Sequence, residues 1–238
     1  MSYNRKTNVI EYNYNIGGVE IKRCTEFRDL GIIMDSRLSF VPHINNINCK
    51  ALKMLGFVIR TTKDFKNTDC MFLLYFAYVR SILEYCTLVW DPYYNIHISA
   101  LENIQRRFCK YVYFRKHGIY PVRNYPQKLL LAEFDLIPLV DRRKYFSLTF
   151  LYKLLHGIIQ DSNLLSQINF CVPRLNNRQP LVFSNQVSRT NQHLHSPILN
   201  MTRLYNVNAA HLDVFVENFR FFCCTCKNLC YNYTPQLA

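Results

Sequence analysis

The stretch LENIQRRFCKYVY, residues 101–113, indicates more about the fold than any other segment of this chain. At a step of about 100° per residue, its apolar side chains share one helix face. These side chains are Leu101, Ile104, Phe108 and Val112. The opposite face carries Arg106, Lys110 and Tyr113. Gly118 and Pro121 are typical of a helix end. The pattern therefore predicts an amphipathic helix from about Ile96 to Lys116, with one side for a core.

The residues before this stretch predict two more helices. Ser39 can cap a helix, and Pro42 suits its first turn. The apolar stripe that follows consists of Ile44, Ile47, Ala51, Leu55, Val58 and Ile59, with Lys50 and Lys53 off the stripe. A second helix is expected from Thr68 to about Val89, stopped by Asp91-Pro92. Its first half, Cys70 to Val79, is apolar all round, which indicates a buried central helix.

Short strands are predicted near the N-terminus. Val9 to Ile16 and Val19 to Cys24 flank Gly17-Gly18, a dipeptide that favours a tight hairpin turn. Leu30 to Met34 reads as a further apolar strand, ended by Asp35-Ser36.

The C-terminal half predicts one long helix and then less order. A helix from about Pro138 to His156 has Asp141 in its first turn and Gly157 as a left-handed cap. Residues 170 to 210 are rich in Pro, Asn and Gln and are expected to be mostly irregular. A last short helix is expected near Asn208 to Phe222, before a Cys-rich end.

The predicted fold is mainly α: a helical bundle with a small N-terminal β-hairpin and strand piece. Four segments are expected along the chain. They are a β-rich segment 1–40, a helical region 41–120, further helices in 121–170, and an irregular region 171–238 with a short helix and a Cys-rich end.

The charge balance is strongly basic, with 29 Lys and Arg against 16 Asp and Glu and a formal net charge of +13. No acid occurs between Glu102 and Glu133, a span that contains seven cations: Arg106, Arg107, Lys110, Arg115, Lys116, Arg123 and Lys128. A solvated basic surface is one interpretation, but such clustering favours a nucleic-acid partner.

Other classes of protein fit less well. The half-apolar composition argues against a disordered chain. No signal peptide is visible, and the longest apolar run, Met71 to Val79, is too short to span a membrane. The ten Cys are mostly scattered singly, which indicates reduced thiols and a nuclear or cytoplasmic location. We expect no membrane partner.

The Cys-rich end invites a zinc hypothesis, because Cys223, Cys224, Cys226 and Cys230 lie close together and His211 precedes them. Structural zinc sites usually take two separated pairs of ligands, whereas these pairs overlap and no partner pair follows. We therefore predict no metal site. His193 and His195 are expected to be ordinary surface residues.

Several strings resemble the region that follows the polymerase palm in non-LTR (LINE-type, jockey-like) retrotransposon reverse transcriptases. They occur in the family's order and cover most of residues 1 to 220. The strings are FRDLGI (27–32), DSRLSF (35–40) with His43-Ile44, LGFVIR (55–60), VRSILEY (79–85), VWDP (89–92) and LENIQRRF (101–108), with weaker echoes at Arg142-Arg143 and at Ser196-Pro197-Ile198.

The resemblance implies a piece of an RNA-directed DNA polymerase without its catalytic centre. Polymerases of this family hold two metal ions with palm carboxylates that include an adjacent Asp pair. This chain has nine Asp and no Asp-Asp dipeptide, so no catalytic residue can be carried over. We expect no enzyme activity from the isolated chain, no cofactor, and Mg²⁺ only together with the missing palm. Residues 1–40 would be the palm's primer-grip end, and Val41 to Lys116 the thumb.

The expected partners are an RNA/DNA template–primer duplex and the missing palm and fingers of the parent polyprotein. Long cationic side chains on a rigid face suit phosphate contacts, and a neighbouring aromatic ring can stack on bases or sugars. The candidate nucleic-acid-binding residues are Arg106, Arg107, Lys110, Tyr113, Arg115, Lys116, Lys50 and Lys53. For Glu84-Tyr85 and Trp90 a structural role is expected, including an Arg80–Glu84 pair.

Two alternatives remain open from the sequence. The first is a truncated gene model of an active reverse transcriptase, and the second is a degenerate or co-opted protein-interaction scaffold without affinity for nucleic acid.

Overall fold

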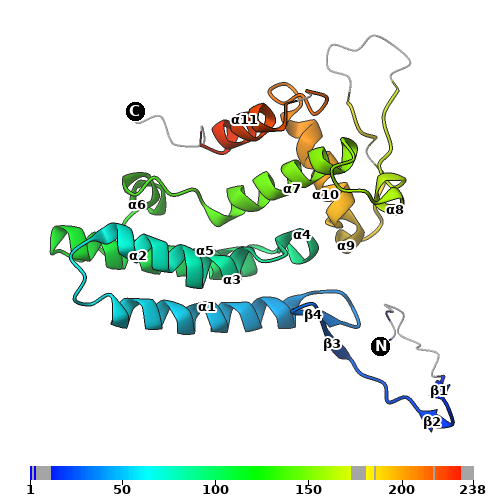
Figure 1. Cartoon of the computed structure of the whole chain (residues 1–238), viewed down its shortest axis with the longest axis horizontal. Coiled ribbons are helices and arrows are strands. Elements are labelled where there is room, and N and C mark those ends of the chain that lie inside the picture. Colours follow the sequence, from blue (N-terminus) through cyan, green and yellow to red (C-terminus); the bar gives the residue numbers. More distant parts are fainter. Residues whose placement is uncertain (2, 4–11, 173–180, 185, 217, 232–238) are drawn as a thin grey trace.

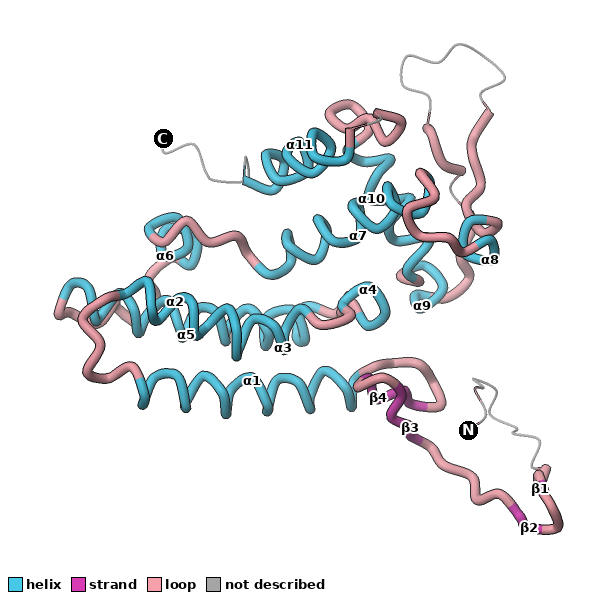
Figure 2. Tube along the Cα trace, viewed as in Figure 1, coloured by secondary structure: helices cyan, strands magenta, loops and turns pink. Residues whose placement is uncertain are grey.

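The structure, a computed structural model, describes residues 1, 3, 12–172, 181–184, 186–216 and 218–231. The predicted mainly helical fold is confirmed, because helices make up most of the described chain and the named strands are confined to the N-terminal arm (Figure 2).

The N-terminal arm consists of two antiparallel hairpins. The first pairs β1 (Asn15–Ile16) with β2 (Val19–Glu20), and the second pairs β3 (Glu26–Asp29) with β4 (Ile32–Asp35). Gly17 and Gly18 have φ of 57° and 82°, which confirms the predicted turn. The part of the predicted first strand at residues 9–11 lies outside the described residues.

The second hairpin corrects a prediction, because Leu30-Gly31 is its turn and does not begin a strand. Both residues have positive φ, 44° and 89°, as this type of tight turn requires. The side chain of Leu30 is consequently 83% exposed, whereas Ile32, two residues later, is buried. The strand begins at Ile32, and β3, which had not been predicted, is its partner.

The first long helix is α1 (Val41–Thr61). Its predicted apolar stripe is buried except for Ile59, which is half-buried. The cap differs from the prediction: the N-cap residue is Phe40, and its N–H donates to the Asp35 carboxylate at 2.9 Å. Ser39 Oγ accepts a longer contact from Val41 N–H, at 3.4 Å.

The second predicted helix is interrupted. It divides into α2 (Thr68–Tyr75), the π-helical turn η1 (Phe76–Arg80), α3 (Ser81–Glu84) and α4 (Thr87–Trp90). Tyr85 is extended and Cys86 is left-handed at φ 54°, so the helix breaks there. One distant and one nearby contact hold the break: Tyr85 Oη donates to the Leu30 carbonyl at 2.8 Å, and Trp90 Nε1 donates to the Tyr85 carbonyl at 2.9 Å.

The segment from Cys70 to Val79 is buried on one side only, so its expected burial on all sides was wrong. Met71, Tyr75 and Val79 are fully buried, whereas Leu73 is 66% exposed. Although this helix has apolar residues on all sides, one of its sides is exposed to solvent.

The most informative predicted helix is confirmed as α5 (Asn95–His117), which Gly118 ends at φ 73°. It is followed by α6 (Gln127–Glu133) and by α7 (Leu139–Leu155), whose predicted cap Gly157 has φ 65°.

The C-terminal region is more helical than predicted. It contains α8 (Ser162–Leu165), α9 (Asn191–Leu194), α10 (Pro197–Asn208) and α11 (Phe219–Tyr231). The span 170–210 was expected to be irregular, but Ser196-Pro197 starts α10, which buries Ile198, Met201 and Tyr205 at helical spacing. The helix expected near Asn208 to Phe222 was also wrong, because α11 begins at Phe219.

Two hydrophobic clusters meet in α7. The first joins β4, α1 to α6 and the start of α7, and the second joins the rest of α7 with α10 and α11. Figure 1 shows the resulting layers, from α1 through α2–α5 and α7 to α11, with the β1–β2 hairpin projecting away from the helices. Within the described ranges, no helix has both the length and the apolarity that a membrane crossing requires.

Candidate nucleic-acid interface

Helices α1 and α5 lie side by side and run in the same direction. Near the start of the pair, the ring of His43 lies 5.3 Å from that of Trp90, which shortly precedes α5. Near the end, Tyr111 Oη donates to the Ile59 carbonyl at 3.3 Å. The two helices also pack along their lengths. Exposed side chains of α1 and of α5 can therefore lie on one continuous surface of the pair.

The open side of this pair is cationic. Helices α2 and η1 cover one side, where the Tyr75 ring stacks on the Phe108 ring at 4.1 Å. By the helical step, Lys53 and Arg60 of α1 and Arg107 and Lys110 of α5 lie on the opposite side. We call these four residues the basic face.

Carboxylates are missing from this surface. Helix α1 contains no Asp or Glu, and α5 contains only Glu102, which is buried. The positive charge of the basic face is therefore not neutralised by an acid on either of the two helices that form it.

The structure separates the eight predicted contact residues into two groups. Lys50, Lys53 and Arg107 are exposed, and Lys110 is half-buried. Lys50 lies on the outer edge of α1, away from α5. Arg60, which is also exposed, was missed, although it falls on the same stripe as Lys53.

The other predicted residues make contacts within the fold. Arg106 Nη2 donates to the Tyr125 carbonyl at 3.2 Å, and its Nε is buried without a hydrogen-bond partner. The Tyr113 ring packs against the rings of His117 and Tyr125. Arg106 and Tyr113 thus hold the chain that follows α5 against the helix.

The cations at the end of α5 are also engaged. Arg115 Nη2 donates to the Phe65 carbonyl at 2.7 Å, and Lys116 Nζ lies 3.3 Å from Glu133 Oε1. Partial burial pushes the pKa of the Glu133 carboxyl upward, but hydrogen bonds from His117 and Lys116 outweigh it, so this pKa lies below its usual range. These contacts leave Lys116 and Arg115 less free than Arg107 to meet phosphate.

The strings that suggested the family contain acids that are structural here. Glu84 pairs with Arg80 at 3.8 Å, as predicted, and also accepts from Arg142 Nη2 at 2.9 Å. Asp91 accepts from Arg143 Nε at 2.7 Å. Burial raises the pKa of the Asp91 carboxyl, and the neighbouring Arg143 opposes that shift.

Glu102 of α5 makes a third carboxylate contact to α7. It accepts the N–H of Val140 at 2.7 Å, at the start of α7. Burial raises the pKa of its carboxyl, and this hydrogen bond opposes the shift. Trp90 is 1% exposed and serves as the predicted core anchor.

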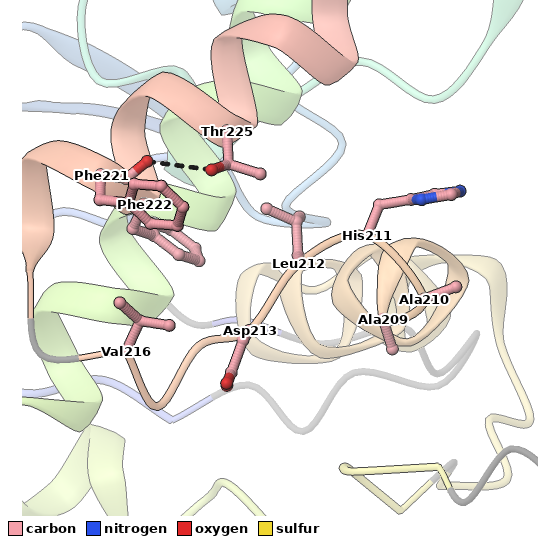
Figure 3. A pocket seen from close by; sticks show the side chains of 9 residues that line it. All are labelled: Ala209, Ala210, His211, Leu212, Asp213, Val216, Phe221, Phe222 and Thr225. Atoms are coloured by element: carbon pink, nitrogen blue, oxygen red, sulfur yellow. Dashed lines mark hydrogen bonds between the residues drawn. The ribbon is translucent and has the colours of Figure 1, made fainter.

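A cavity of about 300 Å³ lies elsewhere, between the end of α10 and α11. Its lining side chains are drawn in Figure 3, where His211 and Asp213 point away from each other and His211 also points away from Phe222 and Thr225. Thr225 Oγ1 is engaged with the Phe221 carbonyl at 3.0 Å. The residues drawn do not form an acid–base pair.

The Cys-rich end lies in α11. Cys226 is buried, Cys223 is half-buried and Cys224 is exposed, so these thiols do not share one environment. The side chain of Cys230 lies outside what the structure describes. Within the part of the chain that is described, no three His, Cys, Asp or Glu side chains gather as a metal ion would need.

Neither the family models, nor the curated proteins, nor the solved structures with which the chain was compared include a match to it.

Proposed function

We propose that this chain binds nucleic acid through the basic face, as the thumb-like helical part of a non-LTR retrotransposon RNA-directed DNA polymerase. One observation carries the proposal: the two longest helices lie side by side, and their open side has cations and no exposed carboxylate. A polyanion with regularly spaced phosphates is the partner that such a surface favours.

The proposed partner is a template–primer duplex, whose backbone presents phosphates at regular spacing. Arg107 and Lys110 are one helical turn apart on α5, a packed helix that holds its exposed side chains in a defined arrangement. Lys53 and Arg60 extend the same surface onto α1. The strings that resemble the reverse transcriptase family support the polymerase context.

A salt titration of duplex binding tests the proposal. Replacing Arg107 and Lys110 by Gln should lower the log–log salt slope by roughly two, because each lost phosphate contact removes about 0.9 for B-form DNA. The matched control is R189Q/R220Q, which removes two exposed cations outside α1 and α5. If both double variants behave alike, or if the unaltered chain does not bind duplex, the proposal fails.

Nucleotide addition itself is proposed to require palm carboxylates that this chain does not supply. We expect no primer extension by the isolated chain on an RNA template, with either magnesium or manganese. Extension that depends on one of its own carboxylates, such as Asp91 or Glu102, would contradict this expectation. Circular dichroism of the D91N and E102Q variants would show whether a loss of activity reflects unfolding.

A further inference from the structure

Three exposed aromatic residues lie where α1 and α5 end. Phe65 follows α1 and is 40% exposed, Phe114 lies in the last turns of α5 and is 42% exposed, and Tyr120 follows α5 and is 58% exposed. We call this group the aromatic end. Three exposed rings at one end of the α1–α5 pair provide apolar surface that a flat apolar ligand can cover.

The aromatic end is held by specific contacts. Arg115, next to Phe114, donates to the Phe65 carbonyl at 2.7 Å and ties the loop after α1 to α5. Thr62 Oγ1 and Tyr111 Oη lie 3.1 Å apart and make a second tie. The ring centroids of Phe114 and Tyr120 are 6.2 Å apart. The Phe114 and Tyr120 rings thus lie near each other, and the backbone that carries Phe65 is tied to α5, so this end needs little rearrangement when a ligand arrives.

Positive charge surrounds these rings. The exposed cations of the two connecting segments are Lys63, Lys66 and Arg123, and Lys110 lies one turn before Phe114. The nearby acids are Asp64 in the first segment, Asp69 in the first turn of α2, and Glu133, which is paired with Lys116 and His117. The ligand for this end should combine negative charge with flat apolar faces.

We infer that the aromatic end binds unpaired nucleotides of a polynucleotide, by stacking bases on Phe65, Phe114 and Tyr120. The inference rests on the proposed nucleic-acid interface and names the kind of strand at one end of it. A base-paired duplex hides the faces of its bases, whereas a single strand presents them beside its phosphates. Because Phe114 lies one turn from Lys110, such a strand would continue from a duplex seated on the basic face.

The test compares a blunt duplex with the same duplex carrying an unpaired overhang, made of RNA in one arm and DNA in the other. Base stacking on an aromatic side chain contributes about 1–3 kcal/mol, or roughly a 5- to 150-fold change in affinity. The variant F65L/F114L/Y120L keeps apolar side chains and removes the rings. It should weaken overhang binding by at least about fivefold and leave blunt-duplex binding unchanged.

A control variant and a rescue separate stacking from other effects. Y78L/F221L removes two aromatic rings that are 47% and 61% exposed and lie outside the aromatic end, and it should bind every ligand normally. Restoring a ring by placing Tyr at position 114 of the triple variant should recover part of the overhang affinity. If the triple variant is misfolded by circular dichroism, the single variants F114L and Y120L take its place.

Each result decides between the two proposals. If the ring variants bind the overhang duplex normally while R107Q/K110Q shows the lowered salt slope, the aromatic end is not a stacking site and the basic face stands. If the ring variants weaken blunt and overhang duplexes equally, the inference about unpaired nucleotides is also wrong. If the ring variants weaken binding of the RNA overhang alone, or of the DNA overhang alone, the result supports the inference and identifies whether the unpaired strand is RNA or DNA.

Discussion

At the scale of single residues, Trp90 joins three parts of the fold. Its indole is buried, lies beside the His43 ring and donates to the Tyr85 carbonyl at the helix break. Replacing Trp90 by Phe removes this hydrogen bond and leaves unfilled volume, so the free energy of unfolding should fall by about 2–3 kcal/mol. Urea unfolding followed by circular dichroism measures the change.

The matched residue for this prediction is Tyr94, an aromatic side chain that is 51% exposed a few positions later. Replacing Tyr94 by Phe should alter the free energy of unfolding by no more than about 0.5 kcal/mol. A W90F variant as stable as Y94F would show that Trp90 does not anchor the break.

At the scale of elements, the break between α3 and α4 places a non-glycine residue in the left-handed region. Cys86 has φ of 54°, and its side chain is exposed. Glycine adopts this conformation without the steric cost of a Cβ atom, so Cys86→Gly should raise the free energy of unfolding by about 0.5–1 kcal/mol. The midpoint of thermal or urea unfolding reports the gain.

The same substitution at Cys70 should have the opposite effect on stability and serves as the control. It is exposed and lies within α2, where glycine costs backbone entropy, so Cys70→Gly should lower stability by up to about 1 kcal/mol. If both glycine variants lower stability, the conformation of Cys86 is not the strained feature.

The elements that were predictable are those whose patterns are local. Helix α5 follows from its apolar spacing and from Gly118, and both act within one segment. The break at Tyr85 was not predictable, because one of the contacts that hold it comes from Leu30, 55 positions earlier in the chain. Helix α10 was hidden by its Asn-rich composition, although Ser196-Pro197 marks its start.

The candidate site was predictable only in part: the sequence indicates a cationic side of α5, but not which of its cations make contacts within the fold. The helical step predicted Arg106, Lys110 and Tyr113 on the side of α5 opposite the apolar face, but Arg106 and Tyr113 contact the chain that follows α5, and Arg107 is the exposed cation. Which cations remain free depends on acceptors from distant parts of the chain. Arg106 donates to the Tyr125 carbonyl and Arg115 donates to the Phe65 carbonyl. No local sequence pattern predicts either contact.

At the scale of the whole molecule, α7 links the two hydrophobic clusters, because Leu139 lies in the first and Leu151 in the second. The single tryptophan, Trp90, belongs to the first cluster and reports its unfolding by fluorescence. Replacing Leu151 by Ala should cost about 2–5 kcal/mol. We expect the Trp90 fluorescence and circular dichroism midpoints to fall together, since one helix serves both clusters.

An exposed leucine supplies the control for this prediction. Leu165 in α8 is 43% exposed, and its replacement by Ala should shift either midpoint little. If L151A lowers the circular dichroism midpoint while the midpoint of the Trp90 fluorescence transition is unchanged, the two clusters unfold independently and α7 does not couple them.

The parallel course of α1 and α5 also has a consequence for the order of folding. Parallel neighbours need a return segment between them, and here the ties between the two helices join residues 49, 50 and 52 positions apart. Loops of that length must close before these contacts form, which slows the step relative to helix formation itself. A chain emerging during synthesis would carry the cations of α1 long before α5 arrives beside them. The surface proposed to bind nucleic acid therefore comes into being only when residues as far as His117 have been made and packed.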